Sequence, residues 1–144
     1  DQLGALRTED GGVDRDFRHE PGRLVLDLLA DGRGRLWIGL NGSGGQAELV
    51  DDDGDLLRRW ETEGDVSAVE RIGSRVYIGG HEMGPGDREV ATIDYDNPGS
   101  LDTSTFNPRI GGGEVLAFHA DGRQLWIGGF LGSGIRGLGR FAAR

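Results

Sequence analysis

Two segments of the chain have residue types and spacing that suit ligand binding. The run GSGIRG at 132–137 has the glycine spacing of a dinucleotide-binding fingerprint. That fingerprint works only where the glycines open a helix whose N-terminus faces the pyrophosphate. The chain has a counterpart, GSGG at 42–45, at the same place in an earlier repeat described below. We therefore expect both runs to be loops between strands, and we predict no nucleotide cofactor.

An acidic run at 51–55 is the second such segment. It places carboxylates at alternate positions, Asp51, Asp53 and Asp55, a pattern that can converge on calcium. A calcium loop of this kind continues with glycine after the third ligand and with glutamate at position twelve. Leu56 and Thr62 stand at those positions. We expect a solvated turn, and the residues leave a weak calcium site open.

The other groups that could take part in catalysis are scattered. His19, His81 and His119 are 62 and 38 residues apart, so their spacing predicts no metal site, and we expect His119 to be packed or hydrogen-bonded. The sequence has no Gly-x-Ser-x-Gly elbow and no cysteine. Asp27 and Glu70, at non-equivalent positions, are the carboxylates nearest to the central axis of the ring of blades that the repeats described below predict. We therefore predict no catalytic residues, no metal site and no enzymatic activity.

Composition restricts the elements that can position these residues. The chain has 144 residues, of which 28 are glycine and 4 are proline. A glycine inside a helix costs about 1 kcal/mol relative to alanine, so long helices are not expected. The net charge of −9 repels nucleic acid and anionic lipid, and no run of residues is apolar enough to span a membrane. We predict no nucleic-acid partner and no membrane insertion.

The chain repeats itself three times. Each repeat begins with an apolar segment that ends in a turn. A second apolar segment follows, in which an aromatic residue is followed by isoleucine and glycine. The pairs are VLDLLADG and LWIG at 25–32 and 36–39, VSAVERIG and VYIGG at 66–73 and 76–80, and VLAFHADG and LWIGG at 115–122 and 125–129. The aromatic residues are Trp37, Tyr77 and Trp126. We expect these rings to pack between twisted sheets.

Each repeat continues with further short apolar segments bounded by glycine-containing turns. Third segments lie at 47–50, 90–94 and 138–141, and fourth segments lie at 56–60 and Leu101–Phe106. Such segments are typical of strands. The run Leu3–Arg7 matches 138–141 and the run Val13–Phe17 parallels the second fourth segment, so residues 1–18 are expected to form part of a blade.

Four short antiparallel strands in a unit of 40 to 50 residues are typical of a β-propeller blade. We therefore predict an all-β fold, a single β-propeller segment of about three blades over residues 1–144. Its units run over 22–61, 62–108 and 111–144, with 1–18 as a partial blade. A closed ring typically has four to eight blades. Three arrangements stay open: a homodimer that closes a six-bladed ring, part of a longer propeller, or a different all-β arrangement.

The chain resembles the bacterial delta-sixty repeat propellers over nearly its whole length, best in the third repeat and partially elsewhere. The resemblance rests on DTSTFNP at 102–108, VLAF at 115–118, LWIGGF at 125–130 and LGRF at 138–141. The first repeat is also similar to the periplasmic propellers of two-component sensors, in the run ADGRGRLWIG at 30–39. Both resemblances imply an exported or surface-exposed propeller that binds a partner and has no defined enzymatic activity.

The residues that follow the second strand of each repeat are the candidate binding residues: Asn41, His81 and Phe130. They vary against a constant framework, which fits a binding face and also fits drift in solvated loops. We predict a non-enzymatic binding or scaffolding module of a secreted, periplasmic or cell-surface bacterial protein, with a protein or a second copy as partner. The alternative is a carbohydrate-binding propeller, which should carry equivalent aromatic and polar pairs in every repeat.

Overall fold

The structure, a computed structural model, describes residues 3–42, 44, 46–86, 88–132 and 137–143. These residues form strands and turns and contain no helix, so the all-β prediction is confirmed. No helix of the described part is therefore long and apolar enough to cross a membrane. The strands are β1 Ala5–Leu6, β2 Val13–Asp14, β3 Val25–Ala30, β4 Arg35–Leu40, β5 Gln46–Asp51, β6 Leu56–Glu61, β7 Val66–Ile72, β8 Arg75–Gly84, β9 Arg88–Asp94, β10 Glu114–Asp121, β11 Gln124–Phe130 and β12 Leu138–Ala142.

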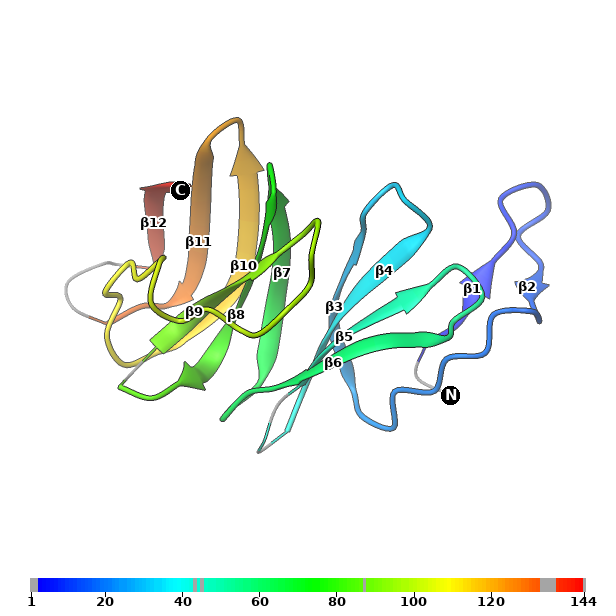
Figure 1. The fold of residues 1–144 in the computed structure, drawn as a ribbon, viewed down its shortest axis with the longest axis horizontal. Coiled ribbons are helices and arrows are strands. Elements are labelled where there is room, and N and C mark those ends of the chain that lie inside the picture. Colours follow the sequence, from blue (N-terminus) through cyan, green and yellow to red (C-terminus); the bar gives the residue numbers. More distant parts are fainter. Residues whose placement is uncertain (1–2, 43, 45, 87, 133–136, 144) are drawn as a thin grey trace.

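The strands form four antiparallel sheets in chain order (Figure 1). A β1–β2 hairpin is followed by a four-stranded sheet, β3-β4-β5-β6, and by two three-stranded sheets, β7-β8-β9 and β10-β11-β12. The first strands of the larger sheets, β3, β7 and β10, lie next to one another, and the two chain ends lie at opposite ends of the molecule (Figure 1). The middle sheet therefore has a neighbour on each face.

The three larger sheets share local geometry. In each of them the turn between the first and second strand contains a glycine with positive φ, Gly32, Gly73 or Gly122, a conformation that favours glycine. Each first strand also has a β-bulge near its start, between 25 and 27, 66 and 68, and 115 and 117. Such a bulge re-aims the strand that contains it. The first two strands of each sheet therefore follow one pattern.

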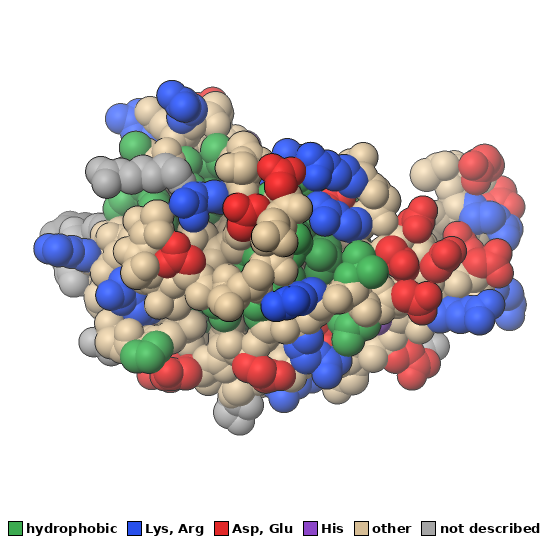
Figure 2. All heavy atoms as spheres, in the orientation of Figure 1, with side chains coloured by type: hydrophobic (Ala, Val, Ile, Leu, Met, Phe, Trp, Pro, Cys, Tyr) green, Lys and Arg blue, Asp and Glu red, His purple; other side chains and the backbone are tan. Residues whose placement is uncertain are grey.

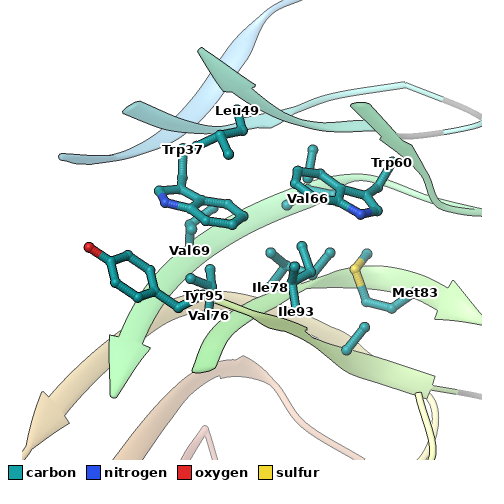
Figure 3. Close-up of a cluster of buried hydrophobic side chains, with 12 residues drawn as sticks. Trp37, Leu49, Trp60, Val66, Val69, Val76, Ile78, Met83, Ile93 and Tyr95 are labelled. Atoms are coloured by element: carbon teal, nitrogen blue, oxygen red, sulfur yellow. The ribbon is translucent and has the colours of Figure 1, made fainter. Parts of the chain in front are cut away.

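One apolar core lies between the sheets β3–β6 and β7–β9. Trp37 stacks on Trp60, with ring centroids 5.4 Å apart and an interplanar angle of 12°. Figure 3 shows these two rings pointing toward Val69 and Ile78 of the neighbouring sheet. Because β3–β6 and β7–β9 bury these side chains against each other, the expected packing of Trp37 between sheets is confirmed.

A second apolar core lies between β7–β9 and β10–β12. Tyr77 meets Phe106 edge to face at 5.1 Å, and Phe106 meets Phe141 of β12 in the same way at 6.4 Å. The expected position of Tyr77 between sheets is therefore confirmed. Trp126 lies on the other face of β11 and is half-buried, with the Arg140 guanidinium 5.4 Å from its ring centroid. No sheet of the described residues covers that face (Figure 1).

The N-terminal residues cover part of the remaining face of β3–β6. Leu3 and Phe17 pack on Ile38, Leu40 and Val50. A polar cluster next to this contact holds the segment in place. The Nε2 atom of His19 lies 2.7 Å from Oε2 of the fully buried Glu48, whose Oε1 accepts a hydrogen bond of 2.8 Å from Nε of Arg59. Buried charge is tolerated because it is paired in this way.

Three expected strands differ in the structure. The run Leu101–Phe106 does not form a strand but only a single bridge between Thr92 and Asp102. The side chain of Asp102 accepts hydrogen bonds from the amides of Ser104 and Thr105, which turns the chain away from the sheet. The runs at 3–7 and 13–17 also pair over two residues each, as β1 and β2.

Candidate functional site

The candidate residues Asn41, His81 and Phe130 lie at the same end of three successive sheets. In each sheet the candidate residue lies on or just after the second strand, where that strand pairs with the beginning of the first strand. The amide of Asn41 donates to the carbonyl of Leu24 at 3.0 Å, and the amide of His81 donates to the carbonyl of Asp65 at 3.1 Å. Phe130 is opposite Glu114 in the third sheet. Together with Glu82 they form what we call the loop row.

Asn41 has a structural task in this row. It is half-buried, and its side-chain oxygen accepts a hydrogen bond of 3.2 Å from the amide of Leu24. The guanidinium of Arg23 donates to the carbonyls of Asn41 and Gly44, at 3.3 and 2.8 Å. Because these contacts fix the loop after β4, Asn41 offers a partner less of its side chain than the other two candidates do.

His81 lies in an irregular part of β8 where the pairing with β9 breaks between Gly79 and Gly84. His81 and Glu82 are exposed, while Met83 turns inward and is buried in the core between the first two larger sheets. Glu82 has a φ of 55°, which is uncommon for a residue other than glycine. This bulge therefore presents an imidazole and a carboxylate side by side in sequence on the surface.

Phe130 ends β11 and is 72% exposed, the most exposed of the large apolar residues in the described chain. The backbone before it needs glycine, because Gly129 has a φ of 156° and a Cβ there would lie 2.0 Å from the carbonyl oxygen of Glu114. An exposed phenyl ring on a constrained backbone is a suitable anchor for a partner surface.

Two carboxylates that the sequence analysis missed connect the members of the loop row. Asp65 accepts a hydrogen bond from the amide of Gly42, in the loop after β4 of the preceding sheet. Glu89 is buried and accepts hydrogen bonds from the amides of Glu82 at 3.0 Å and Gly113 at 3.3 Å. The carboxylates therefore link loops of neighbouring sheets. Both come directly before an apolar strand residue, and this position is the only signal of their role in the sequence.

The carboxylates expected near a common axis bond to the neighbouring sheet. Oδ2 of Asp27 accepts a hydrogen bond of 2.7 Å from the amide of Val69, and Oε2 of Glu70 accepts one of 3.1 Å from the amide of Ala120. Each bond joins the first strand of one sheet to the first strand of the next. The two residues occupy non-equivalent positions but serve the same structural purpose.

The remaining sequence candidates do not gather into a site. In the acidic turn, Oδ1 of Asp51 accepts the amide of Asp55 at 2.8 Å. The described residues contain no group of three or more His, Cys, Asp or Glu side chains able to hold a metal ion. His119 was expected to be packed or hydrogen-bonded. Packing is wrong, because the residue is exposed on the outer face of β10–β12. Most of the glycine-rich run at 132–137 lies outside the described residues.

The ionisable groups with shifted pKa values lie away from the loop row. Burial raises the pKa of Asp31, but hydrogen bonds from the Arg33 amide and from Arg35 outweigh this effect, and the net shift is downward. The Thr105 hydroxyl, followed by Ser104, lowers the pKa of Asp102 far below its usual range. Each carboxylate organises its own turn, and the hydrogen bonds of that turn account for both shifts.

The loop row thus offers an imidazole, a carboxylate and a phenyl ring on loops anchored to a rigid framework. One hollow of the described surface lies away from this row and is lined by Asp16, Arg18, Asp53 and Asp55. A row of this kind suits hydrogen bonding and apolar contact with an extended partner surface. No protein-family model matches the chain, and no curated protein has significant sequence similarity to it.

Proposed function

We propose that the chain is a β-propeller segment of about three blades that acts as a non-enzymatic binding or scaffolding module of an exported bacterial protein. Its partner on the loop row is another protein. The observation that carries this proposal is the combination of one repeated sheet geometry with different exposed side chains, His81 and Phe130, at equivalent loop positions. Loops on a rigid framework are where binding residues concentrate.

The propeller interpretation is supported by how the sheets meet. First strands β3, β7 and β10 lie next to one another, as the innermost strands of adjacent blades do (Figure 1). The bulge and the glycine turn recur in the three larger sheets, and aromatic residues of the second strands fill the space between them. The exported location is supported only by the resemblance to delta-sixty repeat and periplasmic sensor propellers.

A protein partner is favoured over a carbohydrate. Repeated lectin sites should present equivalent aromatic and polar pairs in each sheet, whereas the loop row presents a half-buried amide, an imidazole with a carboxylate, and a phenyl ring. An exposed phenyl ring beside charged and polar groups resembles the composition of protein interfaces.

A random peptide library displayed on phage tests this proposal. We expect selected peptides to bind the parent protein and to lose at least tenfold in affinity for the variant with His81→Ala and Phe130→Ala. The matched control is Leu57→Ala, which removes an exposed leucine of β6 outside the loop row and should leave binding unchanged. Peptides that bind the double variant as well as the parent, or binding to a glycan array that the double variant loses, would overturn the proposal.

A further inference from the structure

The face of β3–β6 toward the N-terminal residues has exposed apolar side chains. The residues at the equivalent positions of the next sheet, β7–β9, are covered by a neighbouring sheet. Leu28 pairs with Ile38 as Val69 pairs with Ile78 in the next sheet. Val69 is 6% exposed because the preceding sheet packs on it, whereas Leu28 is 44% exposed. The N-terminal residues therefore cover only part of this face. We call its open part, formed by Val25, Leu28, Ala30 and Leu36, the head face.

The head face is also hollowed. A hollow of the surface is lined by Phe17, Ala30 and Leu36 together with the turns at 32–35 and 51–52. In the sheet β7–β9 the residue equivalent to Leu36 is Val76, which lies in the core below Trp37 (Figure 3). The head face therefore has apolar side chains, and a hollow, at the positions that receive Trp37 on the sheet β7–β9.

The opposite end of the molecule presents the complementary surface. Trp126 pairs with His119 and Arg140, and Leu138 lies two residues along β12 on the same face. The equivalents of Leu138 are Ala47 and Val90, each 1% exposed because a following sheet covers them, whereas Leu138 is 59% exposed. We call the face formed by Ala117, His119, Trp126, Leu138 and Arg140 the tail face.

Charge makes the two ends complementary as well. Residues 122–144 contain four arginines and no acidic residue, whereas residues 1–20 contain six acidic and three basic residues. Figure 2 shows acidic side chains gathered toward the end of the molecule that carries the β1–β2 hairpin. Opposite charges of this kind guide two surfaces into register and raise their rate of association.

We infer that the partner of each end face is a second copy of this chain, with the tail face of each copy docked on the head face of the other. Trp126 then packs over Leu28 and Leu36 as Trp37 packs over Val69 and Val76. Because both contacts form at once, the pair is closed and leaves neither end open. The inference rests on the proposed propeller arrangement and names the partner of its end faces.

Solution mass, measured by light scattering over a concentration series, tests this pairing. The parent is expected to reach about 31 kDa, twice its 15.5 kDa. Leu28→Arg on the head face and Leu138→Arg on the tail face should each reduce the association constant at least tenfold, because each variant alone disrupts both contacts of its own pair. The control Leu57→Arg changes an equally exposed leucine on β6 and should associate like the parent.

Mixing the two variants gives the sharpest result. In a heterodimer of the two variants, the unaltered tail face of one copy meets the unaltered head face of the other. The mixture should therefore form a dimer at concentrations at which each variant alone stays monomeric. A parent that stays at 15.5 kDa up to high concentration, a mass that grows beyond two copies, or variants that do not complement each other would overturn the inference. A monomer that still binds peptides through His81 and Phe130 would overturn the pairing alone, and leave the proposed binding function standing.

Discussion

Trp37 and Trp126 are the same residue type at the same strand position in two environments, so their replacement by alanine gives a test within one molecule. Trp37 is 1% exposed, stacks on Trp60, and donates a hydrogen bond of 3.3 Å to Asp31. Removing a fully buried tryptophan costs about 3–5 kcal/mol, so we expect Trp37→Ala to lower the free energy of unfolding by about 4 kcal/mol. Trp126 is half-buried and meets Arg140, and its loss should cost only about 1 kcal/mol.

Urea unfolding followed by circular dichroism measures both values, since that signal does not depend on the tryptophan removed. With a slope of about 2 kcal/mol per molar urea, Trp37→Ala should move the midpoint down by about 2 M. The protein concentration must lie below that at which the parent associates, because a docked Trp126 face would add stability by mass action. Equal losses for the two variants would refute the assignment of Trp37 to a core between sheets and Trp126 to an open face.

Two further predictions concern the backbone and the acid limit of stability. Gly80→Ala places a Cβ 1.8 Å from the carbonyl oxygen of Asp65 and should cost about 2 kcal/mol or more in a thermal or urea melt, whereas Gly4→Ala meets nothing within 4 Å and should be nearly neutral. Asp102 has a lowered pKa, owing first to the Thr105 hydroxyl, so it contributes stability above its ordinary pKa that is lost as pH falls toward the folded value. Asp102→Asn should therefore lose less stability than the parent between about pH 4 and pH 2, and an identical pH dependence would contradict this role.

The sequence predicted the strands best where local signals agreed. Short apolar segments bounded by glycine turns became β3 to β5 and β7 to β9, because glycines with positive φ close the hairpins and apolar residues of these lengths suit strands that pack against a neighbouring sheet. The common position of Trp37, Tyr77 and Trp126 predicted packing between sheets, and this is confirmed for Trp37 and Tyr77. It is wrong for Trp126 within this molecule, because no described sheet covers the face on which that ring lies.

The errors arose where a side chain competes with the local pattern. At Leu101–Phe106 the apolar spacing predicted a strand, but the Asp102 carboxylate binds the amides that a strand would use. His119 was expected to be packed or hydrogen-bonded, and it is exposed because no described sheet lies over its face. In both cases the outcome depends on a contact, or the lack of one, that residue patterns do not encode.

The polar links of the structure were also not predictable. His19 and Glu48 are 29 residues apart, and Glu89 is 24 residues from Gly113. Neither pair has a motif, because a hydrogen bond between a carboxylate and a distant group requires only that the fold bring them together. The candidate residues of the loop row could be found from the sequence because the repeats place them at the same end of each sheet. Asp65 and Glu89, which hold the row in place through hydrogen bonds, were not found, because no motif marks their positions.

The most direct test of the account is a nuclear Overhauser spectrum of the monomeric chain that looks for contacts between sheets. We expect cross-peaks from the Trp37 ring to the methyl groups of Val69 and Val76, and from the Tyr77 ring to side chains of β10–β12. We expect no contact from the Trp126 ring to another sheet of the same molecule. Rings of Trp37 and Tyr77 that contact only their own sheets would contradict the stacked arrangement.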